Sequence, residues 1–180
     1  MRIFAISGSL RAVSSNTAAL QALARLAPQG IEIVIYNCLG QLPLFNPDLE
    51  TGELPQAVGN LRNEIALCDG LIICSPEYAH GIAGAMKNAL DWLVSGVEFP
   101  GKSVALINTS PRAVHAQAQM REILTTMSAQ LIEEASIALP LLGRNLGAGD
   151  IAADPQLSGV LKEALQSFVH HIKRHRIEAL

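Results

Sequence analysis

An anion-binding pattern lies near the start of the chain, between a short apolar run and a helical pattern. The apolar run covers residues 3–6, and Ser-Gly-Ser-Leu-Arg-Ala-Val-Ser-Ser-Asn occupies positions 7–16. The first N–H groups of a helix lack internal partners and carry partial positive charge, which favours an anion there. Arg11 adds a planar cation suited to phosphate, and side chains that can donate to phosphate oxygens belong to Ser9, Ser14, Ser15 and Asn16. The pattern predicts an anion site, although it is also typical of a well-capped turn with a surface arginine.

A second polar segment follows a continuously apolar run at residues 71–74. It reads Ser-Pro-Glu-Tyr-Ala-His-Gly and supplies an aromatic ring, Tyr78, and a proline, Pro76, that orients the chain as it leaves the strand. Gly81 and Gly84 permit a close approach of the backbone to a ligand. A planar ligand that carries a phosphate would use both segments, one for its charge and one for its ring. The structural alternative for Tyr78 is simple packing over the end of a sheet.

Alternating strands and helices must position these two segments. Runs typical of strands lie at 3–6, 31–36, 71–74 and 104–107, with a weaker fifth run at 131–139 that is typical of an edge strand. Helical periodicity fills the gaps at 17–26, 56–67, 82–93, 114–127 and 156–174. Such alternation requires parallel strands with helices on both faces. It favours a flavodoxin-like, doubly wound α/β fold with five parallel strands in the order 2-1-3-4-5, and we expect one domain over residues 1–180.

The strand order decides where the two polar segments meet. In an open α/β sheet, ligands bind beyond the carboxyl ends of the strands, where the strand order reverses. That point lies between the first and third strands of the predicted sheet. The segments 7–16 and 75–81 are therefore expected to line one crevice, although they are far apart in the sequence.

Three other segments receive structural interpretations. Residues 37–54 form a long connection without periodicity, but its apolar side chains argue against disorder, and we expect an ordered flap that packs on its own domain or on a partner subunit. Residues 143–150 contain several glycines and are expected to form a mobile loop, because no strong strand precedes them. The basic residues at 170–176 are typical of a solvated helix end.

The composition limits the classes of partner. Of 180 residues, 49% are hydrophobic and 16% are charged, which is typical of a folded chain with a sizeable core. The net charge of −3 gives no reason to expect a nucleic-acid or anionic-membrane partner. No apolar stretch reaches the roughly 18 residues of a membrane span. The three cysteines form no C-x-x-C pair and favour neither a disulfide framework nor a metal site. We expect a cytoplasmic protein without a bound metal.

Several motifs together resemble the NADPH-dependent FMN reductase family, whose members include flavin, quinone, azo-dye and chromate reductases. They are Gly8-Ser9-Leu10-Arg11 with Ser14 and Asn16, Ser75-Pro76-Glu77-Tyr78, Lys87-Asn88-Ala89-Leu90-Asp91-Trp92, and the segment 42–48. The resemblance covers most of the chain, from the first strand through the fourth helix. It implies a flavoprotein oxidoreductase that uses FMN as cofactor and NADPH or NADH as electron donor.

The resemblance also implies a role for each matching residue. The FMN phosphate would be held by Ser9, Arg11, Ser14, Ser15 and Asn16. The isoalloxazine ring would be lined by Pro76, Glu77 and Tyr78 and flanked by Ser110. This chain has Ala113-Val114-His115 where many members have a glycine-rich stretch, and His80 where many have Asn. The contacts that these positions make to the ring or the substrate are left open.

The expected activity is hydride transfer from the nicotinamide to flavin and then to a small-molecule acceptor, by ping-pong. The acceptor would be a quinone, a flavin, an azo dye or a metal oxyanion. The cofactor performs the chemical step, so no side chain is assigned as catalytic. The resemblance implies a homodimer or homotetramer, with Trp92, Leu93 and Val97 either in the core or at the interface. A flavodoxin-type electron carrier and a non-catalytic flavin-binding module are the alternatives.

Overall fold

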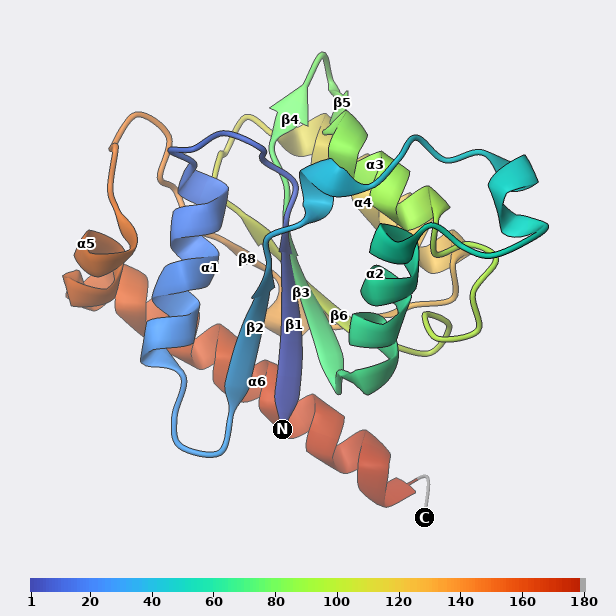
Figure 1. Cartoon of the computed structure of the whole chain (residues 1–180). Coiled ribbons are helices and arrows are strands. Elements are labelled where there is room, and N and C mark those ends of the chain that lie inside the picture. The colour runs from blue at the N-terminus through green and yellow to red at the C-terminus, as the bar shows by residue number, and fades with distance from the viewer. Residues whose placement is uncertain (179–180) are drawn as a thin grey trace.

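A parallel sheet forms the centre of the structure, a computed structural model that describes residues 1–178 (Figure 1). Its strands are β1 (Arg2–Ser7), β2 (Glu32–Tyr36), β3 (Gly70–Cys74), β6 (Ser103–Asn108) and the short edge pieces β7 (Gln130–Leu131) and β8 (Ile137–Ala138). Their order is β2-β1-β3-β6-β7, β8 also pairs with β6, and the pairings are parallel. The flavodoxin-like fold and its predicted strand order are confirmed.

The predicted fifth strand is interrupted. Between β7 and β8 lies a 3-10 turn, η3 (Glu133–Ala135), in which Glu133 and Glu134 are exposed. Successive side chains of a strand point to opposite faces of the sheet, so a continuous strand here would point one of the two carboxylates into the core. Burying an unpaired carboxylate is costly, and the chain turns instead. The hydroxyl of Ser136 fills the gap in the ladder by accepting the N–H of Leu106 at 3.1 Å.

Alternate side chains of the strands pack against two different helix layers. The helices are α1 (Ser15–Leu26), α2 (Gln56–Leu67), α3 (Gly84–Asp91), α4 (Val114–Thr126), α5 (Ala148–Ala153) and α6 (Pro155–Glu178). On β1, Ile3 and Ala5 belong to the core formed with α1, α5 and α6. Phe4 and Ile6 belong to the core formed with α2, α3 and α4. Figure 1 shows these layers on opposite sides of the sheet, and burial on both faces explains why the central strands are continuously apolar.

Two helix predictions need correction. Helix α3 begins at Gly84 rather than at residue 82, because Ile82 pairs in a small antiparallel hairpin of β4 (Glu77–Tyr78) and β5 (Gly81–Ile82). The segment predicted as a mobile loop ends in α5, whose start is fixed by the Asp150 carboxylate accepting the N–H of Gly147 at 2.9 Å. The other predicted helices correspond to α1, α2, α4 and α6. Among residues 1–178, no helix has both the length and the apolar character needed to cross a bilayer.

The long connection 37–54 is ordered and packs on its own chain. Its regular pieces are two 3-10 turns, η1 (Leu39–Gln41) and η2 (Pro47–Glu50). The carbonyl of Pro43 accepts from Asn88 Nδ2 at 2.9 Å and from Trp92 Nε1 at 2.8 Å. The ring of Phe45 meets Trp92 edge-on, with centroids 5.1 Å apart. Trp92 is fully buried, so it belongs to the core and holds the flap in place.

Candidate functional site

A cavity of about 270 Å³ lies beyond the carboxyl ends of β1, β3 and β6. Its walls come from the segments that follow these three strands, together with Leu142, which follows β8. The nine residues that the sequence predicts for cofactor binding all line it, namely Ser9, Arg11, Ser14, Ser15, Asn16, Pro76, Glu77, Tyr78 and Ser110. The cause is the sheet topology, since β1 and β3 are parallel neighbours and end at the same edge. Arg11 and Tyr78 therefore share one cavity.

Several lining residues were not predicted as site residues. They are Ser75, Asn108, Thr109, Arg112, Ala113 and Leu142. A signal for the third wall exists in the sequence, because the polar run 108–110 follows an apolar strand just as the run 7–9 does. Leu142 follows the interrupted edge strand, and no sequence pattern marks it.

The first loop is shaped by its own hydroxyl groups. The N–H of Ser9 donates to Ser7 Oγ and the N–H of Arg11 donates to Ser9 Oγ, both at 3.4 Å. Ser14 is the N-cap of α1, and its Oγ accepts the N–H of Thr17 at 3.3 Å. The capping hydroxyl keeps its proton for a ligand, and the helix begins at the cavity wall. A helix N-terminus capped by a hydroxyl group thus lines the cavity, an arrangement that favours an anion.

The third loop repeats the same design. The N–H of Ser110 donates to Asn108 Oδ1 at 3.1 Å, and the N–H of Arg112 donates to Ser110 Oγ at 3.3 Å. Arg11 and Arg112 are both exposed at the cavity, and neither pairs with a carboxylate in the part of the chain that the structure describes. Two such cations on one cavity favour an anionic ligand.

The second loop folds into the β4–β5 hairpin, which carries Tyr78 beside the cavity. Its turn residues Ala79 and His80 have φ values of 48° and 57°, a left-handed conformation that is uncommon outside glycine. Each such residue costs on the order of 1 kcal/mol, so the turn needs external support. The ring of His80 stacks on His115 of α4, with centroids 4.4 Å apart and 19° between the planes.

Hydrogen bonds from α4 provide further support for this hairpin. Gln119 Oε1 accepts the N–H of Ile82 at 3.2 Å, and Gln119 Nε2 donates to the carbonyl of His80 at 3.3 Å. The carboxylate of Glu77 accepts the N–H of Ala116 at 2.8 Å. The residue before α4 offers no side-chain cap, so Glu77 caps this helix from the hairpin, where the helix dipole favours a negative charge.

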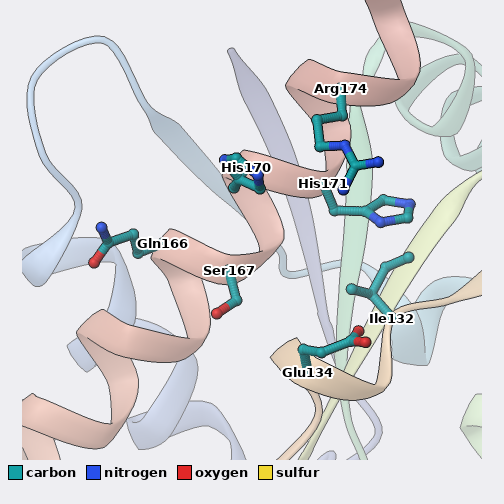
Figure 2. A pocket seen from close by; sticks show the side chains of 7 residues that line it. All are labelled: Ile132, Glu134, Gln166, Ser167, His170, His171 and Arg174. Carbon is teal, nitrogen blue, oxygen red and sulfur yellow. The ribbon is translucent and has the colours of Figure 1, made fainter. Parts of the chain in front are cut away.

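A larger cavity, of about 470 Å³, lies between α6 and the segment that contains η3 (Figure 2). Figure 2 shows His170, His171 and Arg174 on α6, with Ile132 and Glu134 on the other segment. This cavity follows the side of a helix, and the loops after β1, β3 and β6 do not line it. The cavity at the strand ends is the better candidate despite its smaller volume, because it combines a helix N-terminus, two cations and an aromatic ring.

Comparison with known proteins agrees with this geometry. The family model described as NADPH-dependent FMN reductase matches residues 1–141. A Pseudomonas aeruginosa protein named NAD(P)H-dependent FMN reductase is 30% identical over 98% of this chain and 97% of its own length. The quinone reductase of Escherichia coli K12 is 32% identical over 74% of each chain.

A solved structure extends the comparison to the whole fold. The flavoenzyme FerB, an NAD(P)H:(acceptor) oxidoreductase from Paracoccus denitrificans, superposes with a TM-score of 0.83 and 26% identity. The match covers 97% of this chain and 98% of FerB. The family model spans the three strands and loops that build the cavity. This chain belongs to the NADPH-dependent FMN reductase family.

Proposed function

We propose that this protein is an FMN-dependent NAD(P)H oxidoreductase that reduces quinone-type acceptors. The observation that carries the proposal is the single cavity in which the N-terminus of α1, Arg11, Arg112 and Tyr78 meet. The names of the bacterial relatives support the same activity. We also propose that residues 1–180 act as one FMN-binding domain.

The chemistry of the cavity suits FMN. A phosphate would meet the start of α1, the guanidinium of Arg11 and the hydroxyls of Ser9 and Ser14. Tyr78 is 52% exposed and offers a ring face to a planar group. Small-molecule sites commonly measure about 300–1,000 Å³, and a cavity of about 270 Å³ would enclose a flavin only in part. Part of the ring would then remain accessible to a donor and an acceptor.

When bound, FMN would supply the redox chemistry by accepting a hydride from NAD(P)H and delivering it to the acceptor. The residues of this chain would bind and orient. Arg11 would hold the charged end, while Pro76 and Tyr78 would place the ring. One accessible face would serve donor and acceptor in turn, and we therefore expect ping-pong kinetics, with parallel lines in double-reciprocal plots. Intersecting lines would contradict the shared face.

We further propose additional acceptors, self-association and a cellular location. Azo dyes and metal oxyanions are further candidate acceptors, because an accessible reduced ring is the common requirement. Self-association into a dimer or tetramer is supported by exposed apolar side chains near the flap and the end of α3, including Leu44 at 84% and Val97 at 93% exposure. A cytoplasmic location is supported by the free thiols of Cys38, Cys68 and Cys74, as expected in a reducing compartment.

A visible spectrum of the purified protein, with and without added FMN, tests the proposed function. We expect a flavin spectrum that bleaches when NADPH or NADH is added without oxygen, followed by steady NAD(P)H consumption once a quinone is supplied. A protein that binds FMN but consumes no NAD(P)H would be a carrier of the flavodoxin type. A protein that stays colourless after FMN is added would contradict the proposal and favour a module without flavin chemistry.

Removing the Gln119 side chain should loosen the hairpin that carries Tyr78. We expect Gln119→Ala to weaken the binding of FMN and of riboflavin alike, by about threefold to tenfold, because the ring wall loses two hydrogen bonds. Quenching of flavin fluorescence measures both affinities. Gln117→Ala is the matched control on the same helix. The N–H of Gln117 donates to the carbonyl of Ala113, and this backbone hydrogen bond remains when the side chain is removed. Equal affinities in Gln119→Ala and wild type would show that the hairpin keeps its geometry without the Gln119 side chain.

A further inference from the structure

The side chain of Asn16 accepts hydrogen bonds from two other segments of the chain. Its Oδ1 accepts from Cys74 Sγ at 3.2 Å and from Thr109 Oγ1 at 3.0 Å. The three residues are buried, with exposed fractions of 7% for Asn16, 0% for Cys74 and 6% for Thr109. They come from α1, from the end of β3 and from the loop after β6, so this network joins the three segments that build the cavity.

These contacts decide which way the amide of Asn16 points. A carbonyl oxygen can accept from both donors at once, whereas an NH₂ group in its place would have to donate to a thiol sulfur, which is a weak acceptor. Burial raises the pKa of the Cys74 thiol, so the sulfur keeps its proton and remains a donor. Oδ1 is therefore the atom that faces Cys74 and Thr109, and Nδ2 is the atom that remains for a ligand.

We propose that Cys74 and Thr109 are positioning residues that turn the Nδ2 group of Asn16 toward the anionic end of the ligand. The inference rests on the proposed FMN site and gives Cys74 and Thr109 a role in it. Asn16 lies in the first turn of α1 and lines the cavity together with Arg11. Within residues 1–178, Asn16 Nδ2 donates no hydrogen bond, so this donor is available to a phosphate oxygen.

The pair Thr109→Val and Thr109→Ser tests the positioning role. Valine matches the shape of threonine but removes the donor, while serine keeps the hydroxyl. We expect Thr109→Val to raise the Kd for FMN by about threefold to tenfold and to leave the Kd for riboflavin within about twofold. Thr109→Ser should bind FMN nearly as tightly as wild type. Fluorescence quenching with both ligands gives the ratio, and circular dichroism checks the fold. Equal weakening of FMN and riboflavin, or equal weakening by valine and serine, would overturn the proposal.

Two further substitutions keep the test decisive if valine disturbs the packing. Asn16→Asp retains an oxygen for Cys74 and Thr109 but places a second oxygen where Nδ2 stood. We expect a loss of FMN affinity of at least about tenfold with little change for riboflavin, and an unchanged FMN affinity would refute the inference. Cys74→Ser should bind FMN better than Cys74→Ala, because the hydroxyl donates and the methyl group does not; the reverse order would count against the role of Cys74.

The wild-type protein separates this inference from the proposed function. If wild type binds FMN no more tightly than riboflavin, the cavity has no site for the phosphate, and the proposed function loses its basis. A wild type that prefers FMN, combined with an Asn16→Asp variant that keeps the preference, would refute only the inference about Asn16.

Discussion

Gly8→Ala should lower both the stability of the protein and its affinity for FMN. A Cβ at this position would lie 2.3 Å from Ser75 Oγ, 2.8 Å from Ser75 Cβ and 3.1 Å from Ser75 Cα. The N–H of Gly8 also donates to the carbonyl of Cys74 at 2.8 Å, so the two loops are held together and cannot separate freely. We expect an unfolding free energy lower by about 1–3 kcal/mol and an FMN affinity at least about tenfold weaker. Chemical denaturation and flavin titration measure the two effects.

A double-mutant cycle assigns the Gly8→Ala effect to its cause. Ser75→Gly removes the two side-chain atoms nearest the added methyl group, so that the nearest remaining atom of residue 75 is its main-chain α-carbon, 3.1 Å away. The double variant should therefore recover most of the stability and FMN affinity lost in Gly8→Ala, so that its loss is much smaller than the sum of the two single losses. Gly59→Ala in α2 is the control, since its Cβ meets nothing within 4 Å, and we expect it to stabilise by up to about 1 kcal/mol. Additive effects of Gly8→Ala and Ser75→Gly would show that the close approach of the two loops is not the cause.

Periodicity alone predicted most of the fold. The apolar runs in β1, β3 and β6 and the helical patterns between them led to the correct strand order, because parallel crossovers leave few arrangements. The sequence pattern could not predict the hairpin of β4 and β5, which consists of two residues per strand and a left-handed turn without glycine. That turn depends on support from α4, a contact between distant segments. Helix α5 was missed because its six residues are too few to show a helical period.

The candidate site was predicted to the extent that it follows from topology. Arg11 and Tyr78 come together because β1 and β3 are neighbours, and this could be inferred from strand order alone. The roles of Glu77 and Gln119 could not be inferred, because both reach across to another element. The network of Asn16, Cys74 and Thr109 was hidden for the same reason, because its members come from three different segments.

Arg11→Ala should separate phosphate binding from ring binding. A hydrogen bond to a charged group contributes on the order of 1.5–3 kcal/mol, and we expect the Kd for FMN to rise by about tenfold to a hundredfold. Riboflavin lacks the phosphate, so its Kd should stay within about twofold. Turnover at saturating FMN should fall less than FMN retention does, because the proposed role of Arg11 is to hold the phosphate, away from the reacting atoms of the ring.

Arg25→Ala is the matched control for Arg11→Ala. Arg25 is exposed in the last turn of the same helix, α1, whose N-terminus forms the cavity wall. Both substitutions remove one positive charge. If the net charge of the protein attracts the phosphate over a long range, both variants should bind FMN more weakly, and added salt should reduce the difference from wild type. A direct contact weakens FMN binding only in Arg11→Ala, and Arg11→Lys should restore it in part, because lysine keeps the charge but not the planar fork. If Arg11→Ala binds FMN as tightly as Arg25→Ala does, the phosphate does not lie at Arg11. The anion site must then be sought at Arg112, in the loop after β6.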